Sequence, residues 1–158
     1  MYTIGILERT GGLSAFLAAH LSQSLLDRAD LCPAGSLAPG EVLDLLVVSP
    51  DWTGEDRKVS PCRAMLVPGR LAELARRLTA SWAVSFGLSP KDTLTLSSMG
   101  ENTIHLALQR EIVTLTGQRL DPQEFPLARQ DHTALCQVLA CVGVQLLLGV
   151  EPGEVFLA

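Results

Sequence analysis

The feature that most constrains the fold is a short, almost uninterrupted apolar run, LDLLVVS, at residues 43–49. Sequence rich in proline, glycine and polar residues lies on both sides of it. A strand with one solvated face alternates apolar and polar residues, whereas a strand covered on both faces is apolar almost throughout. The run therefore predicts a buried strand of the kind found in parallel sheets.

Segments with strand-like or helical spacing follow one another along the rest of the chain. Strands are expected at residues 2–7, 43–49, 63–67, 82–88 and 93–97, and within 103–115 and 118–127. Helices are expected at residues 14–26, 71–79 and 131–148, and loops at 30–41 and 50–61. The order is β-α-β-β-α-β, then antiparallel strands and a last helix. It predicts a single domain over residues 1–158, a three-layer α/β sandwich with a mainly parallel sheet and an antiparallel β extension.

Composition and charge argue against several classes of protein. Hydrophobic residues make up 47% of the 158 residues and charged residues 18%, which is a globular composition. The 12 basic and 17 acidic residues give a net charge of −5 without a basic patch, so we expect no nucleic-acid partner. No apolar run is long enough to span a membrane, and we see no export signal at the start. We therefore expect no membrane partner and a cytoplasmic location.

Side chains that carry chemistry are few and scattered. The four cysteines form no C-x-x-C pair and do not cluster with the three histidines, so we expect buried, reduced thiols and no metal site. Asp51, Glu55 and Asp56 share one loop, where a cation site is the alternative to the solvated loop that we favour. His105 is expected to be an ordinary surface or core histidine. No Ser/His/Asp or Cys/His set has the spacing of a nucleophilic site, so we expect no catalytic residues among these groups.

One turn has the layout of a ligand site. The stretch IGILERTGGLSAF at residues 4–16 is a strand-like run, a glycine pair and the start of a helical pattern. Backbone amides at such a helix start can bind an anion, and the candidate ligand-binding residues are Thr10, Gly11, Gly12 and Ser14. Glu8 opposes this role, because its carboxylate would repel a phosphate. The alternative is that the glycine pair simply makes a tight strand-to-helix turn.

Three segments, in this order, match a known arrangement of motifs. GILERTGGL at residues 5–13 lies over the phosphate-loop pattern G-x-x-G-x-x-G-K-[ST], with matches at Gly5 and Gly11. Residues 66–98 are similar to a strand and short helix that lead to a V-x-[FY]-G strand and an alternating β segment. HTALCQVLACVGVQLLLGV, at residues 132–150, is similar to a helix of the form H-N-x-x-N-x-x-A-A that ends in Gly. Together they resemble the central ATP-binding domain of the Mur ligase family, which includes the peptidoglycan amino-acid ligases and folylpolyglutamate synthase.

The departures from that family fall on the residues that ATP chemistry needs. Glu8 stands at the second glycine, Gly12 at the phosphate-binding lysine and Leu13 at the magnesium-binding hydroxyl. The run at 43–49 ends in Ser rather than in the family's magnesium-binding Glu, and the loop after it holds no His. We expect no counterpart of the family's substrate-binding and C-terminal domains. The resemblance therefore implies a degenerate phosphate loop, a domain without ligase activity, and no bound cofactor or metal.

Three hypotheses about function follow. In the first, the protein is a non-catalytic interaction or regulatory domain, and the resemblance alone implies a link to cell-wall synthesis. In the second, it binds a small molecule or nucleotide, or is an enzyme, through loops 8–14, 49–56 and 68–70 at the carboxyl ends of the strands. In the third, it self-assembles through the antiparallel extension or the last helix. The low charged fraction fits either a well-buried core or an apolar surface that meets a protein partner or a second copy.

Overall fold

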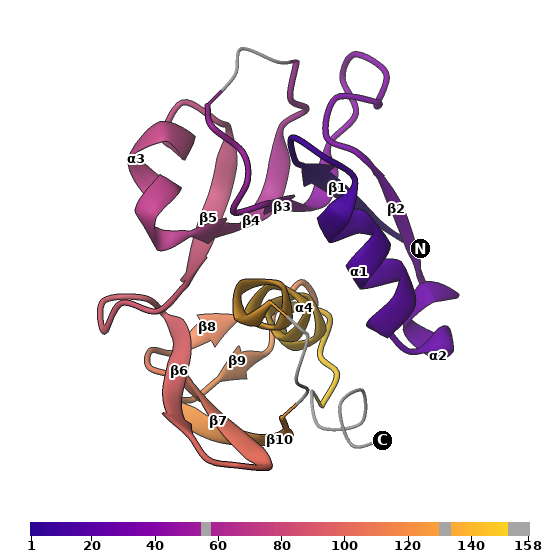
Figure 1. Cartoon of the computed structure of the whole chain (residues 1–158). Coiled ribbons are helices and arrows are strands. Elements are labelled where there is room, and N and C mark those ends of the chain that lie inside the picture. The colour runs from indigo at the N-terminus through magenta and orange to yellow at the C-terminus, as the bar shows by residue number, and fades with distance from the viewer. Residues whose placement is uncertain (55–57, 130–133, 152–158) are drawn as a thin grey trace.

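The computed structural model describes residues 1–54, 58–129 and 134–151 (Figure 1). Its strands are β1 Tyr2–Leu7, β2 Ala29–Pro33, β3 Leu43–Val48, β4 Cys62–Pro68, β5 Ala80–Phe86, β6 Leu94–Met99, β7 Thr103–Leu108, β8 Ile112–Val113, β9 Arg119–Leu120 and β10 Gln123–Ala128. Its helices are α1 Gly12–His20, α2 Gln23–Leu26, α3 Ala72–Ala75 and α4 Leu135–Leu147, with a 3-10 turn, η1 Gly69–Leu71, before α3.

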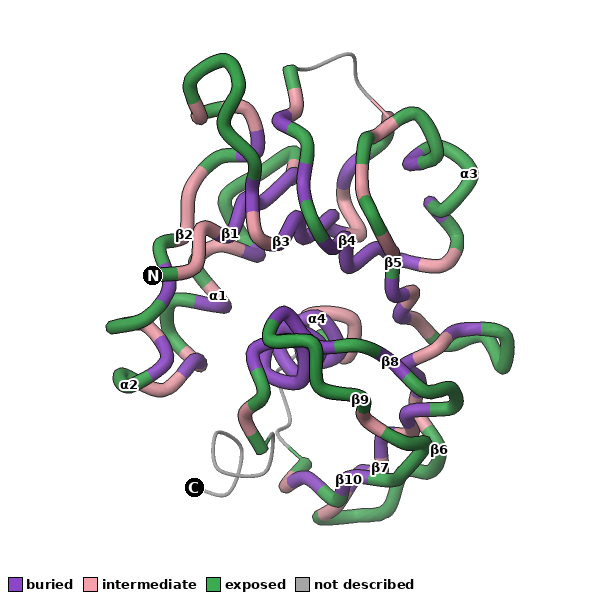
Figure 2. Tube along the Cα trace, turned by 180° about the vertical axis from the view of Figure 1, so that it is seen from behind, coloured by how far each residue is buried: buried purple, intermediate pink, exposed green. Residues whose placement is uncertain are grey.

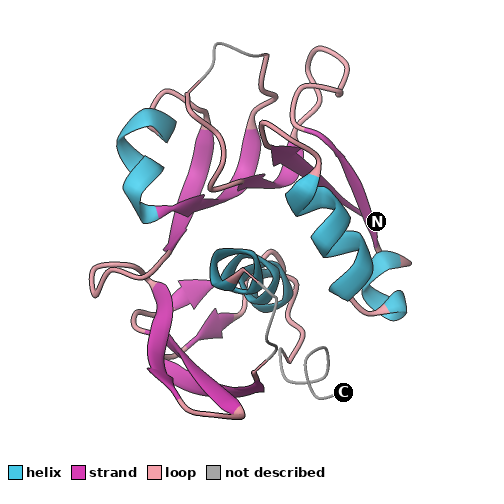
Figure 3. Cartoon of the chain, in the orientation of Figure 1, coloured by secondary structure: helices cyan, strands magenta, loops and turns pink. Residues whose placement is uncertain are grey.

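The protein is an α/β protein with one large, mostly parallel sheet (Figure 3). Eight strands lie in the order β10-β7-β6-β5-β4-β3-β1-β2. All neighbours from β2 to β6 are parallel, whereas β7 pairs antiparallel with both β6 and β10. β8 and β9 form a separate antiparallel pair. The predicted α/β class, the mainly parallel sheet and the antiparallel segment are confirmed.

The apolar run that predicted a doubly covered strand is β3, and it contributes to two hydrophobic clusters. Leu45 and Val47 belong to the cluster that also contains buried residues of α1 and α4. Leu46 and Val48 belong to the other cluster, which contains Leu71 of η1 and Ala75 of α3. Because successive side chains in a strand point to opposite faces, a strand covered on both sides needs apolar residues at every position. This is why β3 does not alternate.

The last helix, α4, lies inside the molecule between the parallel strands and the antiparallel strands (Figure 2). Every residue from Val138 to Leu147 is buried, so the helix is enclosed all round rather than along one stripe. An added Cβ at Gly143 would lie 2.7 Å from a methyl of Leu66, which means that α4 approaches β4 closely at a glycine. The chain's own elements therefore cover the helix that the sequence offered as a contact between copies. No helix among the described residues is long and apolar enough to cross a membrane.

Several predicted bounds differ from the structure. The helix expected at 14–26 is two helices, because Leu21 is extended (ψ 142°) and ends α1. The helix expected at 71–79 ends at Ala75. The loop expected at 30–41 contains most of β2, an edge strand whose backbone pairs with β1 from Tyr2↔Ala29 onwards. Trp52, expected in a surface loop, is 1% exposed and belongs to the core beside α3.

Candidate functional site

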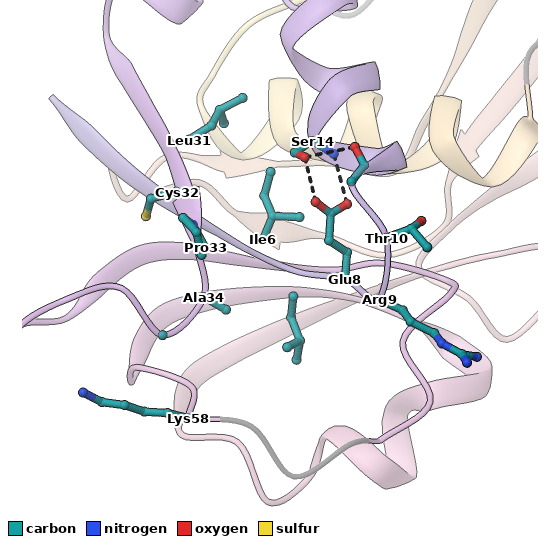
Figure 4. Close-up of a pocket in the computed structure, with 13 residues that line it drawn as sticks. Ile6, Glu8, Arg9, Thr10, Ser14, Leu31, Cys32, Pro33, Ala34 and Lys58 are labelled. Carbon is teal, nitrogen blue, oxygen red and sulfur yellow. Dashed lines mark hydrogen bonds between the residues drawn. The ribbon is translucent and has the colours of Figure 1, made fainter.

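The turn between β1 and α1 is closed by the side chain of Glu8 (Figure 4). One carboxylate oxygen, Oε2, accepts hydrogen bonds from the backbone N–H groups of Leu13 and Ser14, at 3.0 and 3.2 Å. The other, Oε1, accepts a 2.6 Å hydrogen bond from the Ser14 hydroxyl. The first N–H groups of a helix have no partner within the helix and carry a partial positive charge, so they attract an anion. Here the anion is the chain's own carboxylate.

A second carboxylate reaches the same turn from the loop after β3. Asp51 accepts hydrogen bonds from the backbone N–H groups of Arg9 and Thr10, at 3.1 and 3.0 Å, and from the Thr10 hydroxyl at 2.9 Å. Burial raises the pKa of the Asp51 carboxyl, but hydrogen bonds from the Arg9 amide, the Ser49 side chain and Thr10 outweigh it, so the pKa lies below its usual value. Asp51 therefore fastens the turn after β1 to the neighbouring strand β3.

The backbone geometry of this turn does not require its glycine pair, because neither Gly11 nor Gly12 has a positive φ. Gly11 is the N-cap of α1 at φ −74°, and its carbonyl accepts hydrogen bonds from the Ala15 amide and the Ser14 hydroxyl. No side chain at the N-cap position caps the helix. An N-cap Ser, Thr, Asp or Asn supplies that acceptor in many helices, and Glu8 supplies it here from three residues upstream of Gly11.

The structure brings the four predicted ligand-binding residues together in this turn. The hydroxyls and amides of Thr10 and Ser14 already donate to the two carboxylates. Gly11 has open space around its Cα, whereas a Cβ at Gly12 would lie 3.7 Å from the side-chain nitrogen of Gln137 on α4. The sequence pointed to these positions but missed the partner, Asp51, which is 41 residues from Thr10 along the chain.

A cavity of about 470 Å³ lies beside this turn, at the carboxyl ends of β1 and β2. Its lining includes Ile6, Glu8, Ser14, Pro33 and Ala34. Arg9 and Lys58 also border it, but Figure 4 shows their charged ends extending to opposite sides rather than converging. The Glu8 carboxylate points toward Ser14 and is bonded to the start of α1.

The three loops of the ligand-site hypothesis meet only in part. Loop 8–14 meets the loop after β3 through Asp51, and Arg70 reaches that loop from η1 by donating to the carbonyl of Pro50. The cavity is lined by residues of the first loop, of β2 and its following turn, and by Lys58, and not by the loop after β4. Glu55 and Asp56, the other members of the acidic loop, lie outside the described residues.

Other chemistry-bearing side chains do not form a second centre in the described part of the chain. No group of three or more His, Cys, Asp or Glu residues there is arranged to hold a metal ion. All four cysteines are free, and burial raises the pKa of Cys62 to about 11 and of Cys141 to about 12, so these two thiols stay protonated and unreactive. His105 lies 3.3 Å from the Ser98 hydroxyl on the exposed face of β6 and β7.

Asp51→Asn is expected to destabilise the fold near neutral pH and to have a smaller effect in acid. Because the folded-state pKa of Asp51 is lowered, its contribution is present above the unfolded-state pKa and is lost as the pH falls through the folded-state pKa. Urea unfolding of both proteins at about pH 7 and about pH 2–3 measures this change. Asp30→Asn, which removes an exposed carboxylate on β2, is the control. A difference between wild type and Asp51→Asn that stays constant across this range would contradict the assignment.

The fold and the turn define a mostly parallel α/β protein whose first strand-to-helix turn is held by two internal carboxylates. No protein-family model matches the sequence, and no curated protein matches it. The function of the protein must therefore be inferred from its own residues and their geometry.

Proposed function

We propose that the protein is a non-catalytic domain that acts by binding another protein chain, and that it is built on the three-layer plan of a Mur ligase central domain. The observation that supports a non-catalytic role is the set of hydrogen bonds in the turn after β1. The donors that would hold a phosphate there are bonded to Glu8 and Asp51. The resemblance to the ligase family, and with it a link to cell-wall synthesis, is part of the proposal.

Electrostatics supports the loss of nucleotide chemistry. A phosphate in the turn would have to displace Glu8 and Asp51 from six N–H and O–H donors and would then lie beside two negative charges. Phosphoryl transfer also needs a lysine or metal to neutralise the charge that develops on the transferred group. Gly12 stands where the lysine of a phosphate loop would be, and it has no side chain to offer.

The cavity beside the turn favours a second candidate function, the binding of a small molecule. Its volume of about 470 Å³ falls within the range of small-molecule sites. Such sites have a few polar groups that converge on the ligand, whereas the charged ends of Arg9 and Lys58 extend to opposite sides. Small-molecule binding in this cavity is therefore a weaker candidate function than binding of another protein chain.

Isothermal titration with ATP and with ADP, each with and without magnesium, tests the proposal. We expect no binding tighter than the millimolar range, because the phosphate donors are occupied. The Glu8→Ala/Asp51→Ala double variant removes both internal carboxylates and is expected to bind the nucleotides more tightly than wild type. Circular dichroism shows whether the variant is folded. Micromolar binding of ATP or ADP by the wild-type protein would overturn the proposed non-catalytic role and favour a nucleotide-binding protein.

A further inference from the structure

Strand β5 is paired along its full length on one edge only. It pairs with β4 from Cys62↔Ala80 to Pro68↔Phe86, whereas β6 joins it at the single pair Phe86↔Leu94. Before Phe86, no strand among the described residues pairs with β5 on the β6 side. Such an edge leaves backbone N–H and C=O groups without ladder partners, and it is a ready template for another strand.

The hydrogen bond to β6 shows which backbone groups face this open edge. The Gly87 amide donates to the Leu94 carbonyl at 3.1 Å, so the backbone of Gly87 and, by alternation, that of Ala83 face the β6 side. The N–H and C=O groups of Trp82 and Val84 face β4. The indole Nε1 of Trp82 is also buried without a hydrogen-bond partner in the described structure.

The open edge of β5 lines a cleft of about 440 Å³. Trp82 and Val84 line one wall, and Ile112 and Val113 of β8 line the other. Both overall views place β8 between β9 and β5 (Figures 1 and 2). The Thr114 amide donates to the Gln118 carbonyl, so the backbone of Thr114 faces β9. Because backbone groups of successive residues point to opposite edges of a strand, the N–H and C=O groups of Val113 face away from β9. The cleft therefore lies between two unpaired strand edges, one of β5 and one of β8.

The outer edges of the sheet are different, because proline interrupts both. Pro33 is the last residue of the edge strand β2. At the end of β10, the Arg129 amide donates to the Asn102 carbonyl, so the backbone of Arg129 faces the β7 side. Backbone groups alternate between the two edges of a strand, so the nitrogen of Pro126, three residues earlier, lies on the outer edge. Proline has no N–H to donate to an added strand. The cleft edge of β5 contains no proline.

Charge at the mouth of the cleft is positive. The Arg110 guanidinium is held there by hydrogen bonds from Nη1 to the Lys91 carbonyl, at 2.8 Å, and to the Thr93 hydroxyl, at 3.2 Å. No carboxylate pairs with it among the described residues. The neighbouring Glu111 lies 3.8 Å from Arg119, which offsets its charge. A carboxylate on a bound segment would complement Arg110.

We propose that this cleft binds an extended segment of a partner protein as an added strand against β5. The segment has apolar side chains at alternate positions, where they meet Trp82, Val84 and Val113, and a carboxylate at the Arg110 end. Main-chain hydrogen bonds to the N–H and C=O groups of Ala83 supply the pairing that the sheet leaves open. The inference rests on the proposed interaction role and names its surface and the chemistry of its partner.

Fluorescence anisotropy with a labelled peptide tests the cleft on the full chain. The probe is Gly-Thr-Val-Thr-Val-Thr-Val-Glu. Polar Thr alternates with apolar Val along it, and its last residue carries two carboxylates, the Glu side chain and the C-terminus. We expect saturable binding, loss of binding when every Val of the probe is replaced by Pro, and weaker binding when its Glu is replaced by Lys with an amidated end. No binding of the probe, or equal binding of the Pro-containing peptide, would overturn added-strand recognition.

Two variants of the protein locate the bound peptide. Arg110→Gln is expected to weaken binding about fivefold, the effect of losing one surface ion pair. Arg76→Gln is the matched control, because this side chain is 77% exposed and lies on the α3 side of the sheet. Equal affinities of wild type and Arg110→Gln would overturn the carboxylate contact.

Hydrogen exchange examines the edge itself, independently of any variant. In the free protein, the Ala83 amide is expected to exchange at least about tenfold faster than the amides of Trp82 and Val84, which face β4. The probe peptide should slow exchange of the Ala83 amide. Equal protection of all three amides in the free protein would overturn the open edge. Protection that increases with protein concentration alone would identify a second copy as the occupant and overturn the partner peptide.

Nucleotide titration is unaffected by any of these results, so the failure of this inference and the failure of the non-catalytic role are distinguishable.

Discussion

Leu66→Ala is expected to lower the free energy of unfolding by about 2–5 kcal/mol, the range for truncating a fully buried leucine. Leu66 is 0% exposed in β4 and belongs to the larger hydrophobic cluster. Its methyls lie against the backbone of α4 at Gly143, where an added Cβ would be 2.7 Å away. Because that helix is enclosed by other elements, it cannot shift freely to fill the space, and a cavity remains.

Urea unfolding at neutral pH, followed by circular dichroism, measures this loss. The control is Leu74→Ala, the same truncation at a position on α3 that is 45% exposed, where we expect less than about 1 kcal/mol. A loss of similar size at both positions would show that α4 does not pack against β4 as described.

Gly35→Ala is expected to cost about 3 kcal/mol, because the new methyl has no space. The Cβ would lie 2.2 Å from the carbonyl oxygen of Lys58, which is backbone and cannot turn aside as a side chain would. The two segments are also tied by a 2.9 Å hydrogen bond from the Ser60 amide to the Ala34 carbonyl. Relief of the clash therefore requires that one segment moves and that this hydrogen bond is strained or broken.

The matched control for that change is Gly11→Ala. Gly11 has φ −74°, which alanine adopts readily, and no atom lies within 4 Å of the added Cβ. We expect Gly11→Ala to leave stability unchanged within about 0.5 kcal/mol or to raise it slightly by restricting the unfolded chain. Thermal unfolding of both variants compares them directly. If Gly35→Ala melted at the same temperature as Gly11→Ala, the close approach of the two loops would be wrong.

Local sequence pattern was sufficient for the strands that are apolar over their length. β1 was predicted with its exact bounds, and β3 was predicted as a strand covered on both faces. β2 was missed because ADLCP carries a polar residue and a proline and is short, and its strand state comes from pairing with β1. Trp52 was placed at the surface because its neighbours are polar, yet the tertiary fold buries it against the elements of the second cluster.

The sequence marked the turn before α1, but it did not show the hydrogen bonds that close this turn. The glycine pair marked the turn before α1, and Glu8 was recognised as an obstacle to phosphate. A sequence does not show where a carboxylate points, so the bonds from Leu13 and Ser14 to Glu8 required the fold. The β5 cleft had no signal in the sequence, because an unpaired edge depends on where β6 diverges from β5. The relationship to the Mur ligase family stays a prediction.

By itself, the sequence determined the α/β class, the doubly covered strand β3 and the position of the turn after β1. These follow from hydrophobic periodicity and from glycine, which act over a few neighbouring residues. Tertiary structure decided that Asp51 closes the turn from 41 residues away, and that β5 has an edge without a partner. The physical reason is that hydrogen bonds between distant segments depend on which strands become neighbours in the sheet, and that choice minimises the free energy of the whole chain rather than of any local stretch.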